Sequence, residues 1–217
     1  MYLPKHFRAD ERETAELLAA INAADLITPT DGGLFATFLP LLYDPPAGDA
    51  PAGDAEFGSL VGHVARKNDH WRLEPRGDSL VIVRGPDGYI SPGWYESKRE
   101  HGRVVPTWNY LTAHVHGELL IHDDLVWLEA LVRRLTTRYE ASRRQPWSVD
   151  DAPRDYTESQ LRAIVGVELR ITRIEAKAKL GQNRSSADID GVIDGLRADG
   201  DRALADATAG GRRDQNP

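Results

Sequence analysis

A hydroxyl and an ammonium group stand side by side at Ser97 and Lys98, at the end of the segment GPDGYISPGWYESK. Gly and Pro interrupt this segment repeatedly, which predicts a strand that runs into a turn. Phosphate recognition needs such a pair, because a hydroxyl and backbone N–H groups fix the geometry while Lys or Arg neutralises the charge. A solvated turn often carries the same pair, so the spacing alone leaves both interpretations open.

A second group of residues alternates along one predicted strand. His114, His116 and Glu118 stand two apart, and His122 follows. Alternate residues share one face of a strand, so two imidazoles and a carboxylate stand at metal-ligand spacing. An exposed strand face gives the same alternation and is the commoner case, so we predict no metal site. Haem ligation by a histidine is a related alternative that the pattern leaves open.

Composition and missing motifs exclude several kinds of chemistry. The chain has no cysteine, so disulfides, thiolate nucleophiles and cysteine-ligated metals are excluded. It also lacks a P-loop, a G-x-G-x-x-G fingerprint and a G-x-S-x-G nucleophile elbow. If the chain is catalytic, the chemistry therefore belongs to a cofactor that the protein orients.

Charge and hydropathy limit the kinds of partner that the chain is expected to bind. Lys and Arg number 27 against 34 Asp and Glu, a net charge of −7, and the basic residues are scattered. This makes direct DNA binding doubtful, because DNA-binding domains usually present a basic face. No stretch approaches the roughly 18 apolar residues of a membrane span. The N-terminal MYLPKHFRADERE lacks the apolar core of a signal peptide, so we expect no membrane partner and a cytoplasmic location.

The elements that must position these residues are predicted from periodicity. A first helix begins at Asp10, and its apolar residues recur at Leu17, Leu18, Ile21 and Ala24. Further helices are predicted from Asp123 to Glu140, after Thr157, and weakly over residues 186–207. Short strands are predicted at residues 34–44, 58–66, 79–85, 89–95, 104–119 and 164–174. Gly32 and Gly33 predict the turn before the first of these strands. In the last one, Val165, Val167, Leu169 and Ile171 alternate on one side, as in a half-buried strand.

Turn residues and a short repeat predict where the strands begin and end. We expect Gly85 to Gly88 to end one strand, and the 104–119 segment to be two strands joined near Trp108 and Asn109. The perfect five-residue duplication PAGDAPAGDA, residues 46–55, has no apolar face and predicts a mobile loop between two strands of a hairpin. The strands should close on themselves, which gives an α+β fold.

Six blocks of this sequence resemble the FMN-binding negative transcriptional regulators of the PaiB type. They follow the family's order over nearly the whole chain: MYLPKHF, GHVARKNDHW, GPDGYISPGWYESK, VPTWNY, IVGVELRITRIEAK and KLGQNRS. That family is similar to FMN-binding split barrels such as pyridoxamine 5′-phosphate oxidases and flavin reductases. The resemblance implies a six-stranded antiparallel split β-barrel with flanking helices. It also implies a homodimer with FMN in a cleft shared by both subunits.

The resemblance further implies one domain over residues 1–207, with N- and C-terminal helical additions and a disordered tail at 208–217. Ser97 and Lys98 fall where the oxidases bind the FMN phosphate, and Arg66 is a second cation there. The other residues expected to contact the cofactor come from four segments: His63, Ala65, Tyr95, Trp108, Asn109, Tyr110, Gln182, Asn183 and, in the same late loop, Arg184. Core packing for Trp108 and Tyr110, and an ion pair for Arg66, are the alternatives.

Two positions depart from the family. Ala176 stands where Gly is common, and Gly181 stands where Ser is common, which removes a hydroxyl. They leave two alternatives, an FMN-binding chain and a barrel that has lost its cofactor. The sequence predicts an FMN-binding negative transcriptional regulator of the PaiB type. An FMN-dependent oxidoreductase, reductase-like or oxidase-like and without direct DNA binding, is the alternative, and no catalytic residue is assigned.

Overall fold

The computed structural model describes residues 1–46 and 56–212, which divide into two compact units. Unit 1 comprises residues 1–18, 84–113 and 175 to the C-terminus, and unit 2 comprises residues 19–83 and 114–174. The single domain expected over 1–207 stays a prediction. Most of the duplicated loop segment, from residue 47 to 55, lies outside the described residues.

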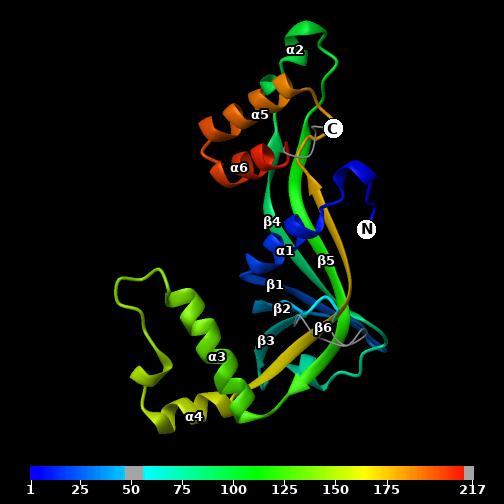
Figure 1. Cartoon of the computed structure of the whole chain (residues 1–217). Coiled ribbons are helices and arrows are strands. Elements are labelled where there is room, and N and C mark those ends of the chain that lie inside the picture. The colour runs from blue at the N-terminus through cyan, green and yellow to red at the C-terminus, as the bar shows by residue number, and fades with distance from the viewer. Residues whose placement is uncertain (47–55, 213–217) are drawn as a thin grey trace. The chain divides into compact units, whose positions relative to one another are not determined.

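Six strands form a closed barrel in the order β1-β2-β3-β6-β5-β4 (Figure 1). Their bounds are Ala23–Thr30 (β1), Gly33–Asp44 (β2), Ser59–Ala65 (β3), Ser79–Ile90 (β4), Thr107–His122 (β5) and Ile164–Lys179 (β6). This confirms the predicted split-barrel fold. The alternation expected near the start of β6 is also confirmed, since Val165, Val167, Leu169 and Ile171 are all buried.

Six α-helices and four short 3-10 helices accompany the barrel in the described residues. The α-helices are Glu11–Ala19 (α1), Ser97–Glu100 (α2), Leu125–Glu140 (α3), Arg154–Arg162 (α4), Ser186–Ala198 (α5) and Arg202–Gly210 (α6). The 3-10 helices are Lys5–Phe7 (η1), Asp69–Arg72 (η2), Pro92–Trp94 (η3) and Val149–Asp151 (η4). None of the helices in these described parts is long and apolar enough to cross a membrane.

The first helix is shorter than its apolar periodicity predicted. Helix α1 ends at Ala19, and Ala24 belongs to β1, a strand that the sequence analysis missed. Within β1, Ala24, Leu26 and Thr28 are buried at alternate positions, which is the period of a strand. The strand turns into β2 through Gly33, whose φ of +107° favours glycine.

Two predicted strand breaks were also wrong. Strand β4 runs through Gly85 and Gly88 to Ile90, and β5 is continuous through Trp108. Gly85 allows close packing here, because a Cβ added to it would lie 2.9 Å from the Cβ of Leu111. A Cβ at Gly88 would similarly lie 2.9 Å from a methyl group of Leu204. At both positions, glycine therefore allows a neighbouring side chain to pack closely against the strand.

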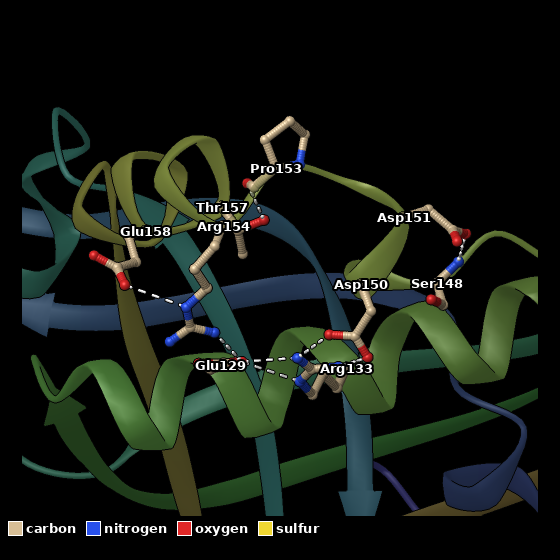
Figure 2. A network of polar contacts seen from close by, with 9 residues as sticks. All are labelled: Glu129, Arg133, Ser148, Asp150, Asp151, Pro153, Arg154, Thr157 and Glu158. Carbon is tan, nitrogen blue, oxygen red and sulfur yellow. Dashed lines mark hydrogen bonds and ion pairs between the residues drawn. The ribbon is translucent and has the colours of Figure 1, made fainter.

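In unit 2, an ion-pair network joins α3, η4 and α4 (Figure 2). Arg133 on α3 bonds both Glu129 and Asp150, at 2.9 and 2.6 Å, and Arg154 on α4 bonds Glu129 at 2.8 Å. Hydrogen bonds from Arg154 and then Arg133 lower the pKa of Glu129. The helix predicted over residues 123–140 is confirmed, with Asp124 as its N-cap.

In unit 1, α5 and α6 pack together over the ends of β4 and β6 (Figure 1). Their shared core comprises Ile90, Tyr95, Ala178, Leu180, Ile189, Val192, Ile193, Leu196, Leu204 and Ala205. The weakly helical region predicted over 186–207 is thus confirmed. Helix α6 continues to Gly210 with Thr208 buried, which is beyond the predicted start of the tail. Residues 213–217 lie outside the described part of the chain.

Candidate functional site

The segment after β4 docks on α5 within unit 1. Ser91 caps η3 by accepting a 3.1 Å hydrogen bond from the N–H of Gly93. Trp94 then lies against Gly191 and Gly195, one turn apart on α5, where added Cβ atoms would collide with it. The glycines of α5 thereby fix the chain just before Tyr95 and Ser97.

Ser97 begins α2 and is bound through both its donors. Its backbone N–H and its hydroxyl donate to the carboxylate of Asp188 at 2.8 and 2.7 Å. Burial by itself would raise the pKa of Asp188, but the hydrogen bonds from Ser97 and the nearby charge of Arg184 bring it below its usual range. Because Asp188 is only 2% exposed, this carboxylate is a buried anion held mainly by Ser97.

The neighbours of Ser97 differ in their surroundings. Lys98 is exposed at the surface of unit 1. Tyr95 is buried, and burial raises the pKa of its hydroxyl. The guanidinium of Arg184 lies 4.7 Å from the centre of the Tyr95 ring, in a cation–π contact. The structure therefore brings the late loop against the segment that contains Ser97.

The aromatic strand segment presents alternating faces. Trp108 is half exposed, and its indole N–H donates to Asp87 at 2.7 Å. Asn109 points the other way and is 3% exposed. Tyr110, half-buried like Trp108, has two lysine ammonium groups near its ring. Because Trp108 is half exposed, it does not pack in the core of unit 1, which was one of the two alternatives for this residue.

Those two lysines are functional candidates that the sequence analysis missed. Lys177 and Lys179 lie in the last part of β6, which extends five residues beyond the predicted end at 174. The signal was present as the K-x-K spacing, which places both side chains on one face if the strand continues. Lys179 donates to the hydroxyl of Thr107 at 2.6 Å and to the carbonyl of Trp108.

The loop after β6 is closed by Gln182. Its side chain accepts from the N–H of Leu180 at 2.9 Å and donates to the carbonyl of Ala178 at 2.7 Å. Asn183 is exposed. Gly181 has φ +84°, a conformation in which a serine would be strained. Glycine at this position therefore suits the backbone of the loop that the structure has.

Three predicted site residues lie in unit 2, where the structure gives them separate surroundings. His63 lines a pocket of about 280 Å³ between β3 and α3, and burial lowers its pKa. Ala65 is exposed at the end of β3. Arg66 donates to both oxygens of Asp123 and to the carbonyls of Arg162 and Ile164, so its guanidinium is already engaged.

The alternating histidines are not gathered around a common centre. His122 bonds Glu168 at 2.8 Å and stacks on Trp127, with ring centres 4.1 Å apart. Glu118 pairs with Arg170 at 3.4 Å. Among the described residues, no group of three or more His, Asp or Glu side chains is placed to hold a metal ion.

Within unit 1, three distant segments meet. Tyr95, Asn109, Gly181 and Arg184 line one cavity of about 10 Å³, together with apolar residues of α5. This cavity is too small for a ligand. It marks the place where the chain around Tyr95, the start of β5 and the late loop come together.

Comparison with known proteins shows similarity to one family along most of the chain. Residues 1–173 match the family model described as "Putative FMN-binding domain". The chain is 35% identical over 201 residues to the protease synthase and sporulation protein PAI 2 of Bacillus subtilis, covering 91% of this chain and 89% of that protein.

Two solved structures share the fold at low identity. The flavocytochrome Anf3 of Azotobacter vinelandii has a TM-score of 0.54 at 15% identity, covering 84% of this chain and 74% of that one. The FAD and heme binding protein of Mycobacterium smegmatis has a TM-score of 0.50 at 19% identity, covering 83% and 77%.

Proposed function

Since this chain belongs to the family of FMN-binding domains, we propose that it holds FMN as a homodimer and acts as a negative regulator of transcription. The observation that carries the proposal is the meeting of Tyr95, Asn109 and Arg184, from three segments far apart in sequence, at one place in unit 1. A cofactor site built from strand ends and a loop needs such a convergence.

The residues of unit 1 fit the two ends of FMN. An isoalloxazine ring needs exposed aromatic surface, which Trp108 offers on β5. Tyr110 is half-buried beside two lysine ammonium groups, so in this proposal it would flank the ribityl chain. A phosphate needs cations and donors, which Lys98 and Arg184 offer. Ser97 can contribute its hydroxyl only by sharing it with Asp188. Bound FMN would supply one- and two-electron redox chemistry, and the protein would supply position and charge.

The remaining predicted contacts are described within each unit and stay predictions. From unit 2, His63 offers a neutral imidazole beside an apolar pocket, and Ala65 leaves room at the end of β3. Arg66 would have to exchange part of its bonding to Asp123 for a phosphate. Gln182 and Asn183 shape the late loop.

A homodimer is supported by an apolar surface on β2. Leu34 and Phe38 are 78% and 69% exposed, and their even spacing places them on one face of the strand. Exposed apolar side chains gathered on one face are typical of an interface. We propose that a second copy of the chain covers them. We also propose a cytoplasmic location, because cytosolic proteins rarely depend on disulfides and this chain has no cysteine.

The regulatory role is proposed to act through a partner or through the state of the cofactor, because the net charge of −7 disfavours a DNA-binding face. The deciding experiment is a titration of the purified protein with FMN, followed by flavin absorbance and fluorescence. Saturable binding with altered flavin fluorescence is the expected result, and no binding at high micromolar FMN would contradict the proposal.

Two further assays separate regulator from enzyme. Oxidation of NADH or NADPH by the FMN-loaded protein would favour the oxidoreductase alternative, whereas no turnover is expected of a regulator. A mobility shift with promoter DNA, measured at several salt concentrations, would show direct repression. We expect no shift without a partner protein.

A further inference from the structure

Three cations gather in unit 1 around the end of β6. Lys177 and Lys179 stand two residues apart and share one face of the strand, while Ala178 between them faces the core of α5 and α6. Arg184 follows in the loop that Gln182 closes. We call Lys177, Lys179 and Arg184 the cationic cluster.

Aromatic rings hold the cluster in place. The ammonium groups of Lys177 and Lys179 lie 5.4 and 5.8 Å from the centre of the Tyr110 ring. Lys177 also lies 5.6 Å from the Tyr2 ring and donates to the Tyr2 carbonyl at 3.1 Å. Ring faces attract cations but carry no net charge, so these contacts do not neutralise the cluster. The charge of Arg184 is partly offset by the buried carboxylate of Asp188, whose pKa it lowers.

Within the described residues, none of the three cations forms an ion pair with a carboxylate. The nearby acids make their direct contacts with other groups, because Asp188 accepts from Ser97 and Glu175 binds the N-terminal amino group at 2.9 Å. Arginines outside the cluster do find such partners, for example Arg66 with Asp123. An unpaired positive centre is thus unusual in this acidic chain.

The cationic cluster is also partly buried. Lys177 is only 7% exposed, which is rare for a lysine without a carboxylate partner. Burial, and then the charges of Lys177 and Arg184, lower the pKa of Lys179. Holding like charges together in this way costs free energy, and an anion at the same place would recover it.

We propose that the cationic cluster binds the phosphate monoester of the flavin cofactor. The inference rests on the proposed function and assigns the phosphate to Lys177, Lys179 and Arg184. The resemblance assigned it to Ser97 and Lys98, with Arg66 as a second cation. A phosphate dianion is opposite in charge to the cluster, and the planar guanidinium of Arg184 suits two of its oxygens. The amide nitrogen of Asn109 lies beside the loop, 3.9 Å from where a Cβ of Gly181 would be, and adds an uncharged donor.

The test compares FMN with riboflavin, which differ by the phosphate alone. Fluorescence titrations would be run on the full chain and on Lys177→Met, Lys179→Met and Arg184→Met, with Lys5→Met, an exposed lysine of unit 1, as the matched control. Losing one charged hydrogen-bond donor should weaken FMN binding by roughly 10- to 100-fold. Riboflavin binding should change by less than about twofold, and Lys179→Arg should restore most of the FMN affinity.

The outcomes separate the two proposals. If FMN binds no more tightly than riboflavin, or if the Met variants weaken both flavins equally while remaining folded by circular dichroism, the phosphate assignment is overturned. If neither flavin binds, the proposed function fails. Inorganic phosphate then tests the cluster directly, because it should shift the Lys179 ammonium resonance in wild type and not in Arg184→Met. An unshifted resonance in wild type would overturn the cluster as a phosphate site.

Discussion

Ser97 donates both its backbone N–H and its hydroxyl to the buried carboxylate of Asp188, 91 residues away in sequence. This pair ties the beginning of α2 to the first turn of α5, where Ser185 caps the helix by accepting from the N–H of Asp188. A carboxylate in the first turn also benefits from the helix dipole. The pair therefore sets the position of Lys98 and of the aromatic residues before it.

Replacing Ser97 by Ala should destabilise the protein by about 1–3 kcal/mol, because a buried carboxylate loses one of its donors. Asp188→Asn should have an effect in the same direction. Urea unfolding followed by tryptophan fluorescence measures it. Asp194→Asn, at an exposed position of α5, is the control and should leave the midpoint unchanged. Equal midpoints for Ser97→Ala and wild type would show that the pair contributes little.

A second prediction concerns the contact of Trp94 with α5. Alanine at Gly195 favours the helix by about 1 kcal/mol, but its methyl group would collide with the Trp94 ring, and overpacking costs about 1–3 kcal/mol. We expect Gly195→Ala to lower the melting temperature and to weaken FMN binding, since the segment before Ser97 must shift. Gly210→Ala, where a Cβ meets nothing within 4 Å, should do neither. A more stable Gly195→Ala protein would contradict this packing.

The barrel could be predicted because its strands carry local signals. The alternation from Val165 to Ile171 and the Gly33 turn depend on nearby residues, and both agree with the structure. Gly85 and Gly88 misled the prediction, because a glycine that ends a strand and one that admits a neighbour look alike in sequence. The neighbours Leu111 and Leu204 are far along the chain, and only the fold reveals them.

The site was predictable only in part, for the same reason. Family-like blocks pointed to Tyr95, Asn109 and the late loop, which do converge. Lys177 and Lys179 were overlooked because charged residues after Ile174 read as the end of a buried strand, whereas β6 continues to Lys179. The hydrogen bonds from Ser97 to Asp188 join residues far apart in the sequence, and no local pattern predicts them.

The apolar face of β2 gives a prediction about assembly. Phe38→Asp places a charge where a second copy is proposed to bind, so it should convert a dimer into a monomer without unfolding the barrel, because Phe38 is exposed. Light scattering after size-exclusion chromatography measures the mass. Val126→Asp, at another exposed apolar position, on α3, is the control. Dissociation by Val126→Asp and not by Phe38→Asp would place the interface elsewhere.

His70 should make the stability of unit 2 depend on pH. It is fully buried, with its two ring nitrogens 2.8 Å from the hydroxyls of Thr28 and Thr37, and Thr28 also bonds Ser79. Burial lowers the pKa of His70 below its ordinary 6.5, so the folded state resists a proton that the unfolded state binds. Stability should therefore fall as the pH falls below 6.5, at a rate that approaches about 1.4 kcal/mol per pH unit.

Urea unfolding at pH 7.5 and 5.5 measures this loss, and His70→Gln should reduce the difference between the two pH values, because glutamine does not titrate. Burial also lowers the pKa of His63, so His63→Gln should remove a further part of it. His6→Gln, at an exposed position, is the control and should leave the pH dependence intact. If His70→Gln loses as much stability between the two pH values as wild type does, the proton that opposes folding binds elsewhere.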